Sequence, residues 1–149
     1  MLFNASPPNS HVPLRHGGFI TSVKGSVASA ADVAFLFKTS GTHCSVSEVV
    51  HAGGVLADCL LARQNAQTIY NVFAPKAAGA SNLWQHSGAI QPLSSTVAFS
   101  SVSARFGSTG QANYAAANAA LDSLSARRQA MGQPAVSVQW GPWWGRVQI

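Results

Sequence analysis

Short apolar runs alternate with longer segments of helical periodicity along most of the chain. Four apolar runs predict strands at residues 19–27, 46–51, 96–100 and 135–140, the first of them a short strand followed by a turn. Three segments between them predict helices at residues 30–37, 60–85 and 111–131. Ser29 is the predicted N-cap of the first helix, Pro75 predicts a kink or a restart in the second, and Gly132 ends the third.

Strands and helices alternate, and every connection is of helical length. This order predicts an α/β fold, with a parallel sheet and helices on both of its faces. Such sheets bind ligands at the carboxyl ends of their strands. The candidates for function are therefore residues 52–54 after the second strand, Ser100 and Ser101 after the third, and Gly141 and Pro142 after the fourth.

The first 18 residues lack periodicity, and they contain three prolines and no acidic residue. They predict an unstructured leader at residues 1–18, followed by a single domain at residues 19–149. A short plastid transit peptide is an alternative interpretation of the same segment.

Composition narrows the classes of function. Of the 149 residues, 47% are apolar and 9% are charged, which is typical of a buried α/β domain. The net charge of +5 comes from scattered basic residues, so nucleic-acid binding is not predicted. No apolar run approaches the roughly 18 residues of a membrane helix. Cys44 and Cys59 predict reduced thiols in a cytoplasmic protein, and His51 has no partner at metal-ligand spacing, so no metal site is predicted.

Residues 99–118, FSSVSARFGSTGQANYAAAN, combine a serine pair with a tyrosine that opens an alanine-rich helix. Tyr114 and Asn118 are four positions apart and so share one helix face. With the serine hydroxyls, they can bind and protonate a carbonyl oxygen. The alternatives are an ordinary half-buried tyrosine, serines that cap a loop, and a solvated surface lysine at Lys76. Asparagine is unfavourable inside a helix, which favours a functional role for Asn118.

Four segments stand in an order that resembles a known family: HAGGVLADCLL, FAPKAAGA, FSSVSARFGSTGQANYAAANAALDSLSARR and SVQWGPW. They resemble the ketoreductase domain of modular polyketide synthases and animal-type fatty acid synthases, which belongs to the short-chain dehydrogenase/reductase superfamily. The resemblance covers about residues 20–145. It implies a Rossmann-like three-layer sandwich.

The family uses NADPH to reduce a β-ketoacyl group tethered to an acyl carrier protein. The resemblance implies this reaction here, with the carrier protein and other synthase domains as partners. It implies catalytic roles for Ser101, Tyr114, Lys76 and Asn118. Tyr114 would donate the proton, and Ser101, thirteen residues before it, would hold the substrate carbonyl. Lys76 would stabilise the tyrosinate and bind a ribose hydroxyl, and Asn118 would hold a relay water.

Two turns resemble the family's cofactor contacts. The turn that begins at His51 is similar to the family's His-Ala-Ala-Gly turn, with Gly53 in place of the second alanine, and the Gly-Pro turn matches the one at the nicotinamide. The implied cofactor-binding residues are Ala52, Gly53, Gly54, Lys76, Tyr114, Gly141 and Pro142.

Two short motifs bear on product stereochemistry. Residues 56–58, Leu-Ala-Asp, keep the second aspartate of the family's Leu-Asp-Asp element. Phe106 stands where the opposite class usually has tryptophan. Both features resemble the class whose product is the D-configured alcohol.

Some parts of the family's fold have no counterpart in this sequence. There is no Gly-x-Gly-x-x-Gly turn for the cofactor pyrophosphate, and the final strand and lid helix are lacking. We therefore expect a partial sandwich without the first two strands and the last. Its first strand would lack its native neighbour, and its second would form an exposed apolar edge.

These observations leave two main interpretations. The first is an NADPH-dependent β-ketoacyl reductase domain, or the catalytic part of one. The alternative is an inactive fragment or remnant that lacks the pyrophosphate-binding turn and binds no cofactor. A stand-alone reductase of free ketones is a third interpretation, against which the YxxxN spacing argues, because stand-alone members usually have YxxxK.

Overall fold

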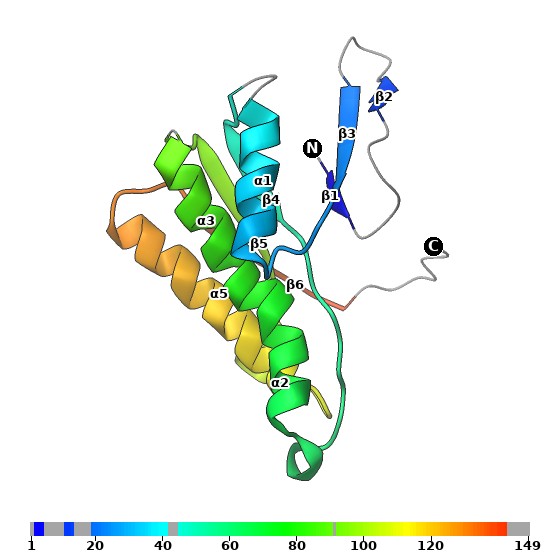
Figure 1. The fold of residues 1–149 in the computed structure, drawn as a ribbon. Helices are drawn as coiled ribbons and strands as arrows, with labels where there is room; N and C mark the ends of the chain where they lie inside the picture. The colour runs from blue at the N-terminus through cyan, green and yellow to red at the C-terminus, as the bar shows by residue number, and fades with distance from the viewer. Residues whose placement is uncertain (1, 5–10, 14–18, 42–44, 91, 143–149) are drawn as a thin grey trace.

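The computed structural model describes residues 2–4, 11–13, 19–41, 45–90 and 92–142. Figure 1 shows the elements in chain order. The strands are β1 (Leu2–Asn4), β2 (His11–Pro13), β3 (Phe19–Lys24), β4 (Glu48–His51), β5 (Ser95–Ser101) and β6 (Val136–Trp140). The helices are α1 (Ala30–Gly41), α2 (Ala66–Phe73), α3 (Gly79–Ile90), α4 (Ser103–Phe106) and α5 (Ala112–Ala130), with a 3-10 turn η1 (Leu61–Arg63) and a π-helical turn η2 (Ala74–Ala78).

The strands β4, β5 and β6 form a parallel sheet with β5 in the centre. In its register, Val97 of β5 lies between Val50 of β4 and Val136 of β6. Helical segments connect the strands, as parallel pairing requires. The predicted α/β fold with a parallel sheet is therefore confirmed, and these three strands differ from their predicted bounds by one or two residues.

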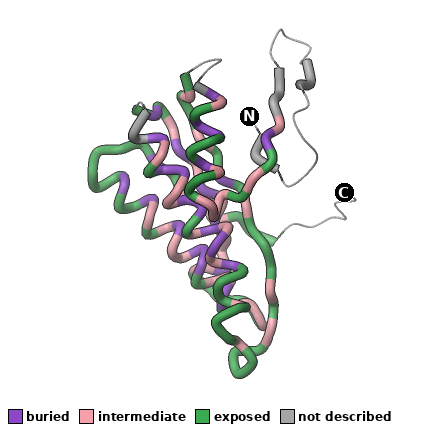
Figure 2. The backbone as a smooth tube through the Cα atoms, viewed as in Figure 1, coloured by how far each residue is buried: buried purple, intermediate pink, exposed green. Residues whose placement is uncertain are grey.

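The helices α1, α3 and α5 lie together on one face of this sheet (Figure 1). In β5, alternate residues such as Thr96 and Ala98 are buried beneath them, and Figure 2 shows how burial concentrates in these helices. On the opposite face, Val50 is 60% exposed. The prediction of helices on both faces is therefore wrong for the described residues. The strands β4, β5 and β6 are successive neighbours, so crossovers of one hand put their helices on the same side.

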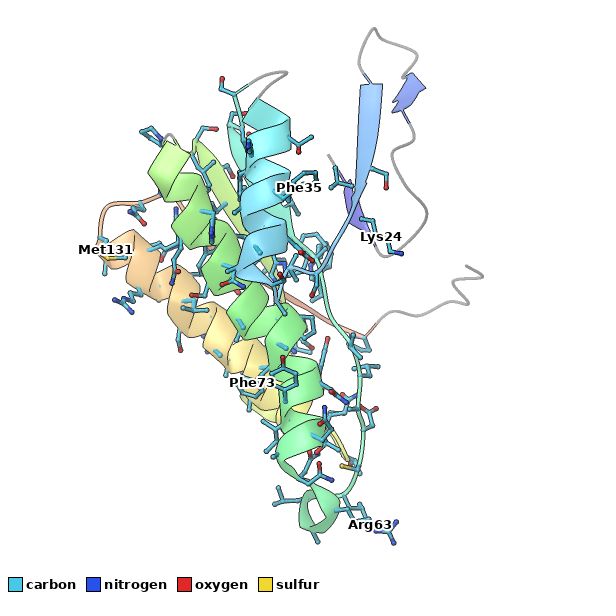
Figure 3. The ribbon with its side chains drawn as sticks, viewed as in Figure 1. Lys24, Phe35, Arg63, Phe73 and Met131 are labelled. Carbon is cyan, nitrogen blue, oxygen red and sulfur yellow. The ribbon has the colours of Figure 1, made fainter. Side chains whose placement is uncertain are left out.

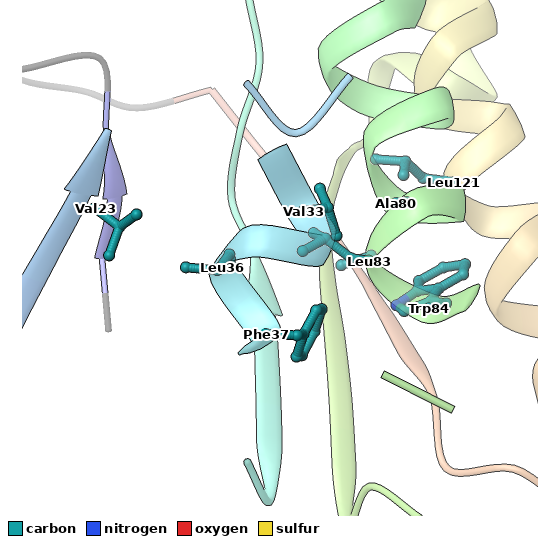
Figure 4. Packing of buried hydrophobic residues seen from close by; sticks show 9 residues of the cluster. Val23, Val33, Leu36, Phe37, Ala80, Leu83, Trp84 and Leu121 are labelled. Atoms are coloured by element: carbon teal, nitrogen blue, oxygen red, sulfur yellow. The ribbon is translucent and has the colours of Figure 1, made fainter. Parts of the chain in front are cut away.

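The apolar core lies between these helices and the sheet (Figure 4). Each helix contributes side chains that its sequence spaces three or four positions apart. Each fully buried aliphatic side chain contributes about 1.5–3 kcal/mol relative to exposure. The buried cluster consists of Val33, Leu36, Phe37, Ala80, Leu83, Trp84, Ala98 and Leu121, together with Val23 of β3, which lies outside the main sheet.

The first predicted strand, β3, does not join the main sheet. It pairs in parallel with β1 and antiparallel with β2. Residues 2–4 and 11–13 are thus strands, and the prediction of an unstructured leader is wrong for them. Strand β2 ends at Pro13, and among the described strands it pairs only with β3, an edge position that tolerates proline. Strand β4 pairs only with β5 among the described strands, which confirms the predicted exposed edge.

The predicted helix at residues 60–85 begins later and ends later. Residues 61–63 form η1, and α2 begins after Asn65 in a capping box: Thr68 N donates to Asn65 Oδ1 and Asn65 N donates to Thr68 Oγ1, both at 3.0 Å. Arg63 projects from the adjoining turn (Figure 3). Pro75 neither ends nor restarts the helix. The chain passes through η2 and continues as α3, because a π-turn accommodates a residue without an N–H.

The other two predicted helices are present near their expected bounds. The Ser29 side chain accepts a hydrogen bond from Asp32 N at 3.2 Å, as predicted for the N-cap of α1. Helix α5 spans nearly the whole of the predicted segment. Gly132 follows it with a φ of +72°, a backbone conformation that glycine adopts without strain.

Candidate active site

The carboxyl ends of β4, β5 and β6 border one cavity of about 290 Å³. It lies where a parallel sheet is expected to bind its ligand. Its lining brings together segments that are far apart in the sequence. The lining residues are Ala52, Gly54, Val55, Leu56, Lys76, Phe99, Ser100, Ser101, Tyr114, Trp140 and Gly141. Of the predicted site residues, Gly53, Asn118 and Pro142 are not part of this lining.

Lys76 is buried in this site, with 4% of its surface exposed. Its Nζ donates a hydrogen bond to the main-chain carbonyl of Phe99 at 3.1 Å, and lies 5.3 Å from the centroid of the Tyr114 ring. Burial lowers the pKa of the Lys76 ammonium, because desolvation disfavours the charged form. The alternative of a solvated surface lysine is therefore wrong.

The π-helical turn η2 carries Lys76, and β4 ends against it. His51, the last residue of β4, is buried, and its Nε2 lies 3.1 Å from the main-chain oxygen of Lys76. A carbonyl oxygen only accepts hydrogen bonds, so Nε2 is the donor. The strand and the turn are thereby tied together at Lys76.

The turn after β4 comes close to the Lys76 side chain. A Cβ added to Gly54 would lie 3.0 Å from Lys76 Cε and 3.4 Å from its Nζ. A contact of 3.0 Å is tighter than nine in ten real Cβ contacts, so a side chain at this position would require the end of the Lys76 side chain to shift. A Cβ added to Gly53 would lie 3.2 Å from Cε1 of His51, behind the cavity.

Both serines of the pair line the cavity, but their hydroxyl groups differ. Ser100 is buried, and its Oγ donates to the main-chain oxygen of Asn118 at 3.3 Å. Ser101 is half-buried, and its Oγ accepts from Ser103 N at 3.2 Å at the start of α4. This acceptor role corresponds to the loop-capping alternative. The hydroxyl hydrogen of Ser101 has no acceptor among the described residues, so it can donate into the cavity.

Asn118 lies one helical turn after Tyr114 and is fully buried, with 0% exposure. Its Nδ2 donates to the main-chain oxygen of Tyr114 at 2.9 Å. Its Oδ1 has no hydrogen-bond partner among the described residues. An unpaired buried oxygen is uncommon in proteins and indicates either a bound water or a functional role.

The end of β6 supplies the remaining wall. Gly141 lines the cavity, and Trp140 both lines it and packs on Phe99, with ring centroids 5.2 Å apart. Pro142 is exposed outside the lining. The two tryptophans that follow, at positions 143 and 144, lie outside the described residues.

Two side chains that the sequence analysis did not assign fasten the loop after β4 to α5. Gln111 Nε2 donates to Asp58 Oδ2 at 2.9 Å, and Asn113 Nδ2 donates to the carbonyl of Ala57 at 2.8 Å. The partners are 53 and 56 positions apart, so no local pattern connects them. The only sequence signal is that two polar residues, Gln111 and Asn113, stand shortly before Tyr114.

Two negative observations apply to the described part of the chain. No three side chains from His, Cys, Asp and Glu gather there as a metal-ligand set. Within the same ranges, no helix combines the length and the apolar character needed to cross a membrane.

The parallel sheet and the site at its carboxyl edge define a Rossmann-like α/β domain. A family model described as the KR domain matches residues 14–145. The chain is 41% identical over 130 residues to polyketide synthase GfsB of Streptomyces halstedii, which covers 87% of this chain and 2% of that protein. It is 40% identical over 126 residues to the spectinabilin polyketide synthase system protein NorB of Streptomyces orinoci, covering 85% of this chain and 6% of that one.

Solved structures give the same result. The first ketoreductase of the tylosin polyketide synthase matches with a TM-score of 0.76 and 37% identity, covering 85% of this chain and 27% of that chain. The PlmKR1 ketoreductase of phoslactomycin biosynthesis in a Streptomyces species matches with a TM-score of 0.75 and 37% identity, covering 83% of this chain and 29% of that chain. The chain therefore belongs to the KR domain family of polyketide synthases, and the resemblance noted in the sequence is confirmed. It spans less than a third of each of these solved structures.

Proposed function

We propose that this chain carries the catalytic centre for NADPH-dependent reduction of a β-ketoacyl thioester, held on an acyl carrier protein, to the β-hydroxyacyl thioester. The observation that carries the proposal is the convergence of Lys76, Ser101 and Tyr114 on one cavity. These groups come from η2, β5 and α5. Family membership supports ketoreduction in polyketide biosynthesis as the class of reaction.

The residues present fit one end of the proposed cofactor. A Cβ added to Gly54 would crowd the end of the Lys76 side chain, whereas a Cβ added to Gly141 would meet nothing within 4 Å. This arrangement supports a nicotinamide and its ribose between the Gly54 turn and the Gly141 turn, with Ala52 and Gly53 supporting the first turn. When bound, NADPH supplies the hydride to the ketone carbon. The sequence has no Gly-x-Gly-x-x-Gly turn, so the fit concerns the nicotinamide end alone.

The proton would come from the chain's own side chains. In the proposed mechanism, the Tyr114 hydroxyl donates its proton to the ketone oxygen as negative charge develops there. The Ser101 hydroxyl donates a hydrogen bond to the same oxygen. The Lys76 ammonium, 5.3 Å from the Tyr114 ring, stabilises the phenolate that remains.

Asn118 would restore that proton through water. Its Oδ1 is a buried acceptor without a partner among the described residues, while its Nδ2 is held by the Tyr114 carbonyl. We propose that Oδ1 binds a water only when the cofactor and substrate are in place, and that this water belongs to the path that returns a proton toward Lys76 and Tyr114.

The loop after β4 is proposed to orient the acyl chain. It carries the Leu-Ala-Asp element, and Asp58 is held by Gln111, close to the start of the helix that bears Tyr114. The position of Asp58 supports the proposed D-configured product. Reversed-phase separation of the product on a chiral column tests this assignment, and an L-configured product would overturn it.

The decisive experiment is NADPH titration of the full chain, followed by an assay with a β-ketoacyl thioester. We expect saturable binding, oxidation of NADPH, and a loss of about 10²–10⁴-fold in kcat for Tyr114→Phe. Unchanged turnover in Tyr114→Phe would contradict the assignment of the proton donor. Absence of NADPH binding by the folded chain would support the alternative, an inactive remnant without the pyrophosphate site.

A further inference from the structure

His51 has no role in the proposed chemistry, although it is buried next to the site. It is 3% exposed, ends β4, and contacts the main-chain oxygen of Lys76 through Nε2 at 3.1 Å. This contact falls on the same residue whose side chain reaches Phe99 and Tyr114. The main chain and the side chain of Lys76 are therefore held from two sides, by β4 and by β5.

We propose that His51 is the positioning residue for Lys76, because its Nε2–H holds the Lys76 carbonyl and so keeps η2 in the π-helical form that directs the ammonium into the cavity. In a π-helical turn each residue is rotated less than in an α-helix, so conversion between the two forms turns the preceding side chains around the axis. A conversion of η2 to regular helix would therefore move Lys76 Nζ away from Phe99.

The Lys76 carbonyl has two donors from different elements. Gly79 N–H, at the end of η2, donates to it from within the helix, and His51 Nε2 donates to it from β4. The N–H that Pro75 lacks would have served a carbonyl before the proline, so it does not explain the contact with His51. The His51 contact is the one that ties the turn to the neighbouring strand.

The surroundings keep the imidazole in the form that can donate. Burial is the main cause that lowers the pKa of His51, and the positive charge of Lys76 lowers it further, while the carbonyls of Lys76 and Pro75 oppose this effect. A neutral imidazole carries one ring proton, and the carbonyl partner requires it on Nε2. Gly53 leaves space for the ring, since a Cβ there would lie 3.2 Å from Cε1.

The effect of His51 on catalysis rests on the proposed function. Its effect on the position of Lys76 can be tested without an activity assay. The sequence has only three lysines, so ¹³Cε-labelled lysine gives a simple NMR spectrum in which Lys24 and Lys38 are internal references. The matched variants are His51→Gln and His51→Met. Both side chains are unbranched and of similar volume, but only glutamine places an N–H donor near the position of Nε2.

In the wild-type chain we expect Lys76 to titrate below the ordinary value of 10.5 and to show NOE contacts with the Tyr114 ring. The His51→Met variant should lose these contacts, and its Lys76 pKa should rise toward 10.5, since the ammonium leaves its buried position. The His51→Gln variant should retain both features. His86→Met is the control, because His86 contacts another helical carbonyl, that of Asn82 at 2.8 Å, away from the lining of the cavity.

Circular dichroism and a thermal melt establish that each variant is folded before its lysines are titrated. If His51→Met does not fold, His51→Asn replaces it, because its shorter amide does not reach the position of Nε2. A folded donor-free variant with wild-type Lys76 titration and NOE contacts would overturn the proposal. Loss of both features in His51→Gln would overturn it as well, because the donor would then not be the property that matters.

Discussion

Replacement of Asn118 by alanine is expected to leave the protein almost as stable as the wild type, although the side chain is fully buried. The loss of the Nδ2 hydrogen bond to the Tyr114 carbonyl costs about 1 kcal/mol. Removal of Oδ1, which is buried without a partner among the described residues, recovers about 1–3 kcal/mol. Alanine also gains up to about 0.7 kcal/mol in helix propensity.

Lost packing around a small side chain opposes these gains by about 1 kcal/mol. The sum predicts a free energy of unfolding between about 1 kcal/mol below and about 2 kcal/mol above that of the wild type. The matched control is Leu121→Ala, one turn further along α5 and also 0% exposed, for which a cavity cost of about 3 kcal/mol is expected.

Urea denaturation monitored by circular dichroism measures both variants under one set of conditions. A loss for Asn118→Ala equal to that of Leu121→Ala would refute the reasoning. It would mean that Oδ1 is satisfied in solution by a bound water, whose hydrogen bonds the variant also removes. The proposed catalytic role predicts that Asn118→Ala loses turnover, although the variant is stable.

Three further predictions concern the buried lysine, the glycine turn and the open face of the sheet. Burial lowers the pKa of Lys76 in the folded chain below 10.5, its ordinary value, which applies to the unfolded chain. Between these two pKa values the unfolded chain binds more protons than the folded chain, so the free energy of unfolding rises with pH. Denaturation curves from pH 8 upward should show this rise in the wild type but not in Lys76→Met. Equal slopes of the free energy of unfolding against pH in the two proteins would contradict the burial of the Lys76 charge. Gly54→Ala should displace the ammonium and destabilise by about 1 kcal/mol, whereas Gly141→Ala, with open space around its Cβ, should stay within about 0.5 kcal/mol in the same assay. Val33→Ala, at 0% exposure, should cost about 2 kcal/mol, whereas Val50→Ala, at 60%, should cost less than about 0.5 kcal/mol. Equal losses at the two valines would show that the outer face of the sheet is covered in solution.

The local pattern was sufficient for the elements of the main sheet and for part of the site. Apolar runs and caps predicted β4, β5, β6 and α5 within two residues. The interval of four between Tyr114 and Asn118 predicted their common helix face, and the observed Nδ2 contact with the Tyr114 carbonyl follows from it. These features depend on neighbours in sequence, so the sequence contains the physical information they require.

Other features depended on contacts between distant segments. The sequence predicted a kink or a restart at Pro75, but it could not show that a π-helical turn, η2, would join α2 to α3 there, with the carbonyl of Lys76 contacted by His51 from another strand. The predicted leader contains β1 and β2 because β3 lies outside the main sheet and pairs with them. Local propensity does not encode such pairing, which forms only when the chain has folded.

The sequence by itself determined the order of the elements, the strand ends at which function would gather, and the residue types that could carry ketone reduction. Only the tertiary structure decided that Lys76 is buried and directed at Phe99 and Tyr114, and that the helices cover a single face. It also decided that the loop with Asp58 is fastened to α5. The physical reason is that burial and desolvation depend on which segments pack together, and a pattern along the chain specifies only which surface of each element is apolar.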